Sequence, residues 1–201
     1  MSSLAEKNST GFWRKSAVFV LLIIVYLIVA VPFKVMEIIP GFTDIRPVSM
    51  LMPVFGIFFG IPGCIAYAVG NLITDIVSDS LKWSSIAGFA ANFIGPFVYY
   101  LFWIKLSKNQ FHLRKGRNLL KHTLVIIIDA LLVAGMITPF VALSYPEVNT
   151  ALFFVMVLIN SSAFPFCIGI PLIILMQDEL GFKPIERKHK IKDMPKQYGK
   201  Y

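Results

Sequence analysis

Charged residues are scarce in this chain. Asp, Glu, Lys and Arg together make up 15% of its 201 residues, whereas soluble domains usually contain about 25%. Apolar residues make up 57%, and they gather in long runs that carry almost no charge. This composition excludes an ordinary soluble domain and predicts an integral membrane protein.

Residues and motifs that often carry catalysis are also rare. We find neither a phosphate-binding glycine loop nor a G-x-S-x-G serine motif. The two cysteines lie inside apolar runs without metal-ligand spacing, and we interpret both as small buried hydrophobes. We place the three histidines in loops or in the C-terminal tail. These five residues are Cys64, Cys167, His112, His122 and His189. We therefore expect no catalytic residue, metal or cofactor, and a protein that is not an enzyme.

Acidic residues number only 11 against 19 basic ones, for a net charge of +8. The positions of the charges argue against nucleic acid as a partner, because 16 of the 19 basic residues form three clusters between or beside apolar runs. With an even number of spans all three clusters fall on one side, which the positive-inside rule makes cytoplasmic. The clusters are Lys7, Arg14 and Lys15; Lys105, Lys108, Arg114, Lys115, Arg117 and Lys121; and Lys183, Arg187, Lys188, Lys190, Lys192, Lys196 and Lys200.

The apolar runs predict an all-α bundle of about six transmembrane helices over residues 16–176. A cytoplasmic segment, residues 1–15, precedes it, and a solvated basic cytoplasmic tail, residues 177–201, follows. Pro62 and Gly63 predict a tight turn between the second and third spans. The expected spans are 16–36, 47–61, 63–78, 85–104, 123–143 and 151–176. Small residues spaced four apart, as at Gly56 and Gly60, indicate close helix packing.

A polar stripe marks the third predicted span. Tyr67, Asn71, Asp75 and Asp79 recur every four residues, so they share one helix face. Polar groups at bilayer depth are costly and invite a functional interpretation. Two further amides, Asn92 and Asn160, fall at a similar depth in spans four and six, beneath outer loops that carry Asp44, Arg46, Trp83, Tyr145 and Asn149. The set predicts an outward-opening pocket.

Each amide taken alone is equally well explained by a hydrogen bond between neighbouring helices. Asp129 lies nearer the basic loop, about a third of the way into span five. A proton or ion site and a structural pairing with a hydroxyl or amide both remain open for this carboxylate.

Four motifs between Asp44 and Tyr100 carry a resemblance to a known family: D-I-R-P, F-G-x-x-F-G, G-N-L-I-x-D and S-I-x-G-F-x-x-N-F. This stretch resembles the substrate-binding S components of energy-coupling-factor (ECF) vitamin transporters. It looks most like the branch associated with queuosine precursors, with cobalamin transporters as relatives. The resemblance implies six helices in the plasma membrane of a prokaryote, with both termini inside. It also implies a vitamin-like ligand bound near the outer face, and a membrane coupling subunit with two ATPases as partners.

The resemblance also implies roles for particular positions. Family pockets map onto the loop after span one and the outer parts of spans four to six, which here means Asp44, Arg46, Trp83, Asn92, Tyr145, Asn149 and Asn160. Many members dock their coupling subunit through an A-x-x-x-A pattern on span one, whereas here Ala17 is followed four residues later by Leu21. Candidate docking residues are Ser16, Ala17, Gly56 and Gly60.

The sequence therefore leads to a solute-binding membrane subunit of an ATP-driven importer, with Asn71 and Asp75 supporting the pocket. The choice of cobalamin or a queuosine precursor as ligand rests on the resemblance alone. Two alternatives stay open. One is a self-contained secondary carrier or channel that uses Asp75 or Asp129 for ion coupling, and the other is a membrane enzyme with an unfamiliar motif.

Overall fold

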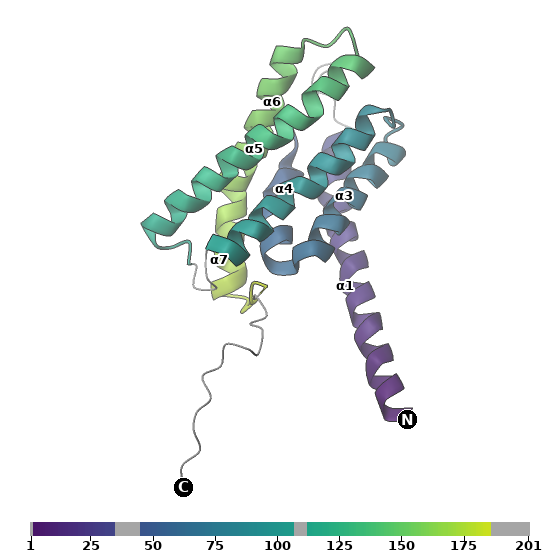
Figure 1. The fold of residues 1–201 in the computed structure, drawn as a ribbon, viewed down its shortest axis with the longest axis vertical. Coiled ribbons are helices and arrows are strands. Elements are labelled where there is room, and N and C mark those ends of the chain that lie inside the picture. The colour runs from purple at the N-terminus through teal and green to yellow at the C-terminus, as the bar shows by residue number, and fades with distance from the viewer. Residues whose placement is uncertain (1, 35–44, 107–111, 186–201) are drawn as a thin grey trace.

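The computed structural model describes residues 2–34, 45–106 and 112–185, with side chains from Trp13 onward, and all regular structure in these ranges is helical (Figure 1). Five of its helices are long and apolar enough to cross a membrane: 13–34, 47–77, 84–105, 116–144 and 150–178. Helices are the expected solution, because every backbone polar group inside a bilayer must be bonded within the chain. The protein is therefore a multi-pass helical membrane protein.

The first helix, α1 (Ser2–Lys34), is the least buried of the five spans. It packs on α3 (Gly60–Val77) through Tyr26, whose side chain is buried and whose ring stands edge-on to the Tyr67 ring. Its N-terminal half extends beyond the rest of the bundle (Figure 1).

The stretch before α3 folds back on it as a short arm. This arm, residues 47–59, consists of a 3₁₀ turn η1 (Pro47–Met50), α2 (Leu51–Val54) and a π-helical turn η2 (Phe55–Phe59). The Tyr67 hydroxyl donates to the Val48 carbonyl at 3.2 Å, although 19 residues of straight helix would separate them by about 28 Å. The arm and α3 are therefore antiparallel, as the sequence predicts for its second and third spans.

The turn between them lies at Gly60, not at Pro62 and Gly63 as the sequence suggested. Gly60 has φ 58°, a left-handed backbone conformation that favours glycine. Pro62 lies in the first turn of α3, where a missing backbone N–H costs nothing. The arm has 13 residues, about 20 Å of helix, which is shorter than the hydrocarbon core of about 30 Å.

Close packing of the arm against α4 (Ser84–Leu106) depends on Gly56. A Cβ atom at Gly56 would lie 2.0 Å from the Pro96 carbonyl oxygen, so any side chain would force the two elements apart. A Cβ at Gly60 would lie 3.0 Å from the Tyr100 ring. The Gly56/Gly60 ridge is therefore covered by this chain's own α4.

The remaining helices pack one after another beyond α4. They are α5 (Gly116–Ser144) and α6 (Thr150–Phe164), followed by a π-helical turn η3 (Pro165–Gly169) and α7 (Ile170–Asp178). Helix α4 lies between α3 and α5, and α6 packs on α5.

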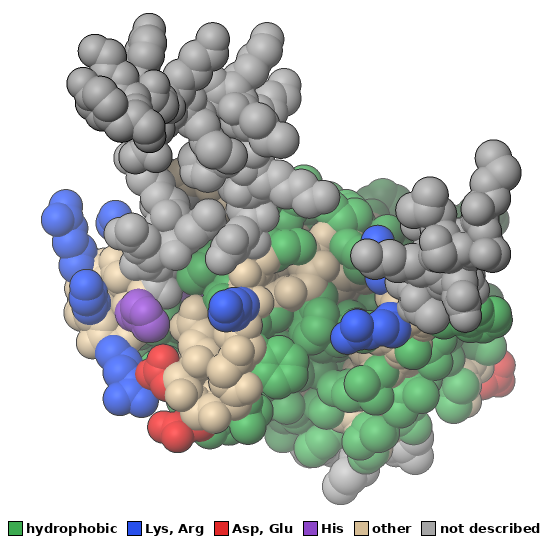
Figure 2. Space-filling model, turned by 90° about the horizontal axis from the view of Figure 1, so that it is seen from below, with side chains coloured by type: hydrophobic (Ala, Val, Ile, Leu, Met, Phe, Trp, Pro, Cys, Tyr) green, Lys and Arg blue, Asp and Glu red, His purple; other side chains and the backbone are tan. Residues whose placement is uncertain are grey.

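The two ends of the described chain lie toward the same end of the bundle, which we call the basic end (Figure 1). Arg114 Nε lies 2.6 Å from Asp178 Oδ2 there, and Figure 2 shows Lys and Arg side chains spread over this face. The Trp103 indole donates to the Ile185 carbonyl, and the Ile185 N–H donates to the Ile57 carbonyl, both at 2.9 Å. The predicted solvated tail therefore begins with a segment that packs against the bundle.

Two side chains differ from the sequence-based assignment. His122 lies inside α5, fully buried, with its ring 5.6 Å from that of Tyr99 and 6.0 Å from that of Phe102; the prediction of a loop position was wrong because α5 begins earlier, at Gly116. Cys64 is buried as predicted, but Cys167 is exposed on the bundle surface.

Candidate functional site

A compact group of polar side chains lies at the end of the bundle opposite the basic end. Helix α3 provides its base, with Asn71, Thr74 and Asp75 all buried on one face. The Thr74 hydroxyl donates to the Gly70 carbonyl of its own helix at 2.8 Å. That leaves Asn71 and Asp75 to bond with other elements.

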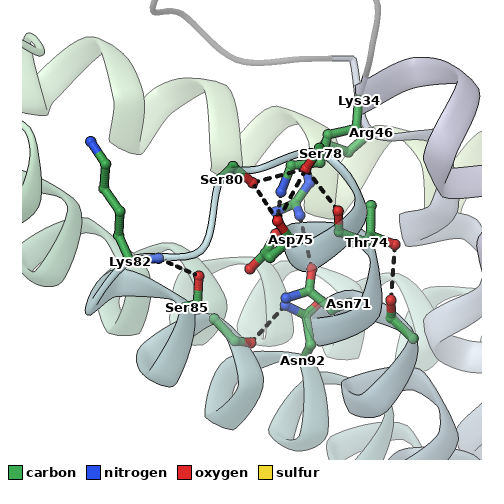
Figure 3. A network of polar contacts seen from close by, with 12 residues as sticks. Lys34, Arg46, Asn71, Thr74, Asp75, Ser78, Ser80, Lys82, Ser85 and Asn92 are labelled. Atoms are coloured by element: carbon green, nitrogen blue, oxygen red, sulfur yellow. Dashed lines mark hydrogen bonds and ion pairs between the residues drawn. The ribbon is translucent and has the colours of Figure 1, made fainter.

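Arg46 joins three parts of the fold at this point, and Figure 3 shows its bond to Asn71. Its guanidinium Nη2 donates to Asn71 Oδ1 on α3 at 3.0 Å, and its backbone N–H donates to Asn160 Oδ1 on α6 at 3.0 Å. The Tyr26 hydroxyl of α1 donates to the same Asn71 oxygen at 3.3 Å. One amide of α3 thus connects α1 to the segment that leads into η1, and that segment in turn reaches α6.

An ion pair completes the group, which we call the polar centre: Tyr26, Lys34, Arg46, Asn71, Asp75, Asn92 and Asn160. Lys34 at the end of α1 pairs with Asp75 on α3, and their side chains are 18% and 9% exposed. Among these seven residues two are cations and one is a carboxylate. The polar centre therefore carries a net positive charge, a suitable setting for an anionic or acceptor-rich group.

The two remaining amides are held partly by their own helices. Asn92 is buried and donates to the Gly88 carbonyl at 2.7 Å, and it lies beside Asn71 in Figure 3. Asn160 Nδ2 donates to the Met156 carbonyl at 3.0 Å. These bonds fix the orientation of both side chains at a depth matching that of Asn71.

The free space at the polar centre is small. Tyr26, Lys34, Arg46 and Thr74 are among the residues that line a cavity of about 10 Å³, which suffices for about one water molecule. Beside this cavity Arg46 bonds to both α3 and α6.

Three of the predicted pocket residues lie outside the polar centre. Trp83 is 82% exposed and lines an apolar surface groove of about 1060 Å³. Its neighbour Lys82 places Nζ 3.5 Å from the centroid of the Tyr145 ring. Asn149 caps the N-terminus of α6 by accepting from the Leu152 N–H at 3.1 Å. Asp44 lies outside the described residues.

Sequence reasoning missed Lys34 and Tyr26. After the three basic clusters are set aside, the leftover basic residues are Lys34, Arg46 and Lys82, and all three lie at the end of the bundle opposite the basic end. The position of Lys34 outside the three basic clusters was the sequence signal for its place at this end of the bundle. Tyr26 gave no signal, since one tyrosine in an apolar run is equally well placed in lipid.

A second buried acid lies away from the polar centre. Asp129 on α5 is fully buried, and neither carboxylate oxygen has a hydrogen-bond partner among the described residues. It faces the Tyr99 hydroxyl of α4, which is buried as well. Its Oδ1 lies 3.6 Å from where a Cβ would stand on Gly95 of α4.

Of the residues predicted to contact a coupling subunit, only those on α1 are at the surface. Ala17 is exposed and Ser16 is half-buried, whereas Gly56 and Gly60 are covered by α4. The described residues also contain no group of three or more His, Cys, Asp or Glu side chains placed to hold a metal ion.

Comparisons with known proteins leave the family of this chain open. No family model matches its sequence, and neither a curated protein nor a solved structure matches it.

Proposed function

We propose that this protein is the substrate-binding membrane subunit of an ATP-driven, ECF-type importer. The observation that carries the proposal is the position of Arg46, which bonds to amides on two different helices at one end of the bundle. A guanidinium, an ammonium, a carboxylate and three amides at one end of a largely apolar bundle are the kind of lining that orients a small polar ligand. The ligand class is a vitamin or vitamin-like molecule, with cobalamin or a queuosine precursor as the first to test.

The proposed orientation follows from charge. The basic end faces the cytoplasm of a prokaryotic cell, and the polar centre faces outward. The 47–59 arm, although shorter than the hydrocarbon core, then serves as the second of six spans and α3 as the third, with both termini inside. A cysteine placed at Arg114 is expected to resist a membrane-impermeant reagent in intact cells, whereas one placed at the exposed Trp83 reacts. The reverse pattern would overturn this orientation.

Binding in this scheme is an exchange of hydrogen bonds. A ligand acceptor takes the Arg46 donors now used by Asn71 and Asn160, and the released amides then bond to the ligand. Because each protein–protein bond is replaced by a protein–ligand bond, the centre opens at a modest net cost. Capture and release are therefore controlled by the segment that carries Arg46.

Energy for uptake comes from partners in this proposal. A membrane coupling subunit docks on the exposed side of α1 around Ser16 and Ala17, and two ATPases drive it, because the chain contains no phosphate-binding loop. The protein reconstituted alone is expected to bind its ligand without accumulating it. Accumulation driven by an ion gradient alone would contradict the proposal.

A self-contained ion-coupled carrier is the second candidate, and one observation favours it. Asp129 is a fully buried carboxylate without a hydrogen-bond partner among the described residues, and such groups in membrane helices often mark ion pathways. Asp75 fits this role less well because Lys34 already pairs with it. In liposomes, ion-driven uptake that disappears in Asp129→Asn would establish the carrier.

A further inference from the structure

An apolar groove opens at the basic end, between α1 and the turn that joins the short arm to α3. Its volume is about 520 Å³. Helix α1 supplies one wall, and the π-helical turn and the start of α3 supply the other. The apolar lining residues are Val18, Phe19, Leu22, Phe58, Phe59 and Pro62. The groove exists because α1 diverges from the bundle below its contact with α3 (Figure 1).

Two cations, Arg14 and Lys15, complete the lining of this groove. Both are exposed, and no described residue that lines the groove is acidic. Trp13 precedes them and is 69% exposed; tryptophan is enriched at the level of the lipid headgroups. The cations therefore lie at headgroup depth, next to an apolar channel that extends toward the membrane interior.

An amphiphile with an anionic head fits this arrangement. Arg and Lys bind phosphate through charge-assisted hydrogen bonds, and basic pockets between transmembrane helices on the cytoplasmic side bind acidic headgroups. A free phosphate would leave the apolar walls unused. An apolar helix of another protein would leave two cations without counter-charge.

We propose that this groove binds one anionic phospholipid of the cytoplasmic leaflet. The acyl chain lies against Phe19, Phe58 and Phe59, and the phosphate lies between Arg14 and Lys15. The site requires the basic end to face the cytoplasm and is independent of solute uptake. A lipid held here fills the space between α1 and the turn at Gly60 and contacts both.

The test uses the full chain in nanodiscs and in native mass spectrometry, with phosphatidylglycerol and phosphatidylcholine as probes. Each cation near an acidic membrane surface strengthens binding by about fivefold. Replacing both in Arg14→Gln/Lys15→Gln is therefore expected to weaken phosphatidylglycerol retention by about 30-fold and to leave phosphatidylcholine unaffected. The charge-matched control is Lys115→Gln/Arg117→Gln, at exposed positions of the same end that do not line the groove.

A second pair of variants tests the groove without changing charge. Val18→Trp fills it, whereas Val20→Trp adds the same bulk at an exposed position outside its lining. Only Val18→Trp is expected to displace phosphatidylglycerol, with the thermal stability of both variants measured alongside. Equal losses in the two charge variants, or unchanged retention in Val18→Trp, would overturn the proposal. So would crosslinking of a cysteine at Val18 to a protein partner in membranes without any retained lipid.

Discussion

Arg46 donates hydrogen bonds to Asn71 and Asn160 from different atoms, and this difference can be measured. Its side chain donates to Asn71, whereas its backbone N–H donates to Asn160. The change Arg46→Ala deletes the first bond and leaves the second intact. Combined with Asn71→Ala and, separately, with Asn160→Ala, it forms two double-mutant cycles that share one member.

The structure sets the expected size of each coupling energy. Hydrogen bonds to charged groups contribute about 1.5–3 kcal/mol in soluble proteins, and bonds between membrane helices contribute about 0.6–2 kcal/mol. We therefore expect a coupling of about 1–2 kcal/mol between Arg46 and Asn71. For Arg46 and Asn160 the two losses add to within about 0.5 kcal/mol, because the backbone donor survives in Arg46→Ala.

Reversible unfolding in mixed detergent micelles, followed by circular dichroism, supplies the free energies of unfolding. Because the same Arg46 variant enters both cycles, a general weakening of the fold cancels from the comparison. Equal coupling in both cycles, or none between Arg46 and Asn71, would show that the arrangement of the polar centre is wrong.

Further substitutions test three other features of the fold. Gly56→Ala should destabilise the protein by about 1–3 kcal/mol, because its Cβ meets the backbone of α4. Gly135→Ala, where nothing lies within 4 Å, should be neutral or stabilise by up to about 1 kcal/mol; a similar loss in both would refute the close approach. Lys34→Met and Asp75→Asn should each lower the melting temperature more than the double variant does, since a single change removes one charge of a partly buried ion pair and leaves the other in place. Asp129→Asn should leave the melting temperature unchanged or raise it, because it removes a carboxylate that is fully buried; a clear fall would reveal a bonded carboxylate.

The helical membrane architecture could be predicted because it follows from the length of the apolar runs. The polar stripe of α3 was also readable, since Asn71 and Asp75 are one helical turn apart. The structure brings both together with Arg46 and Asn160. That convergence was predicted from depth alone, because polar side chains at the same depth in a small helical bundle have few other polar groups to contact.

Helix faces and helix ends were harder to predict. Cys167 lies in a run that is apolar on all sides, so no periodicity distinguishes its buried face from its exposed face. His122 follows Lys121, which suggested a loop, yet α5 extends through both, with Lys121 exposed and the imidazole packed on two aromatic rings. Trp83 and Asn149 were grouped with the pocket because they lie in outer loops. The position of a residue in a loop does not determine whether its side chain points toward the pocket.

Ligand affinity tests the central claim most directly. A screen of the purified protein, begun with cobalamin and a queuosine precursor, is followed by titration of Arg46→Gln and of Asn149→Ala, whose side chain only caps α6. Loss of a charged donor to a buried ligand costs about 1.5–3 kcal/mol, so Arg46→Gln should bind about 10- to 150-fold more weakly. Asn149→Ala should bind within about twofold of the unaltered protein, although it loses a helix cap that contributes about 1 kcal/mol. Unchanged affinity in Arg46→Gln, with the variant shown to be folded, would contradict a binding site at the polar centre.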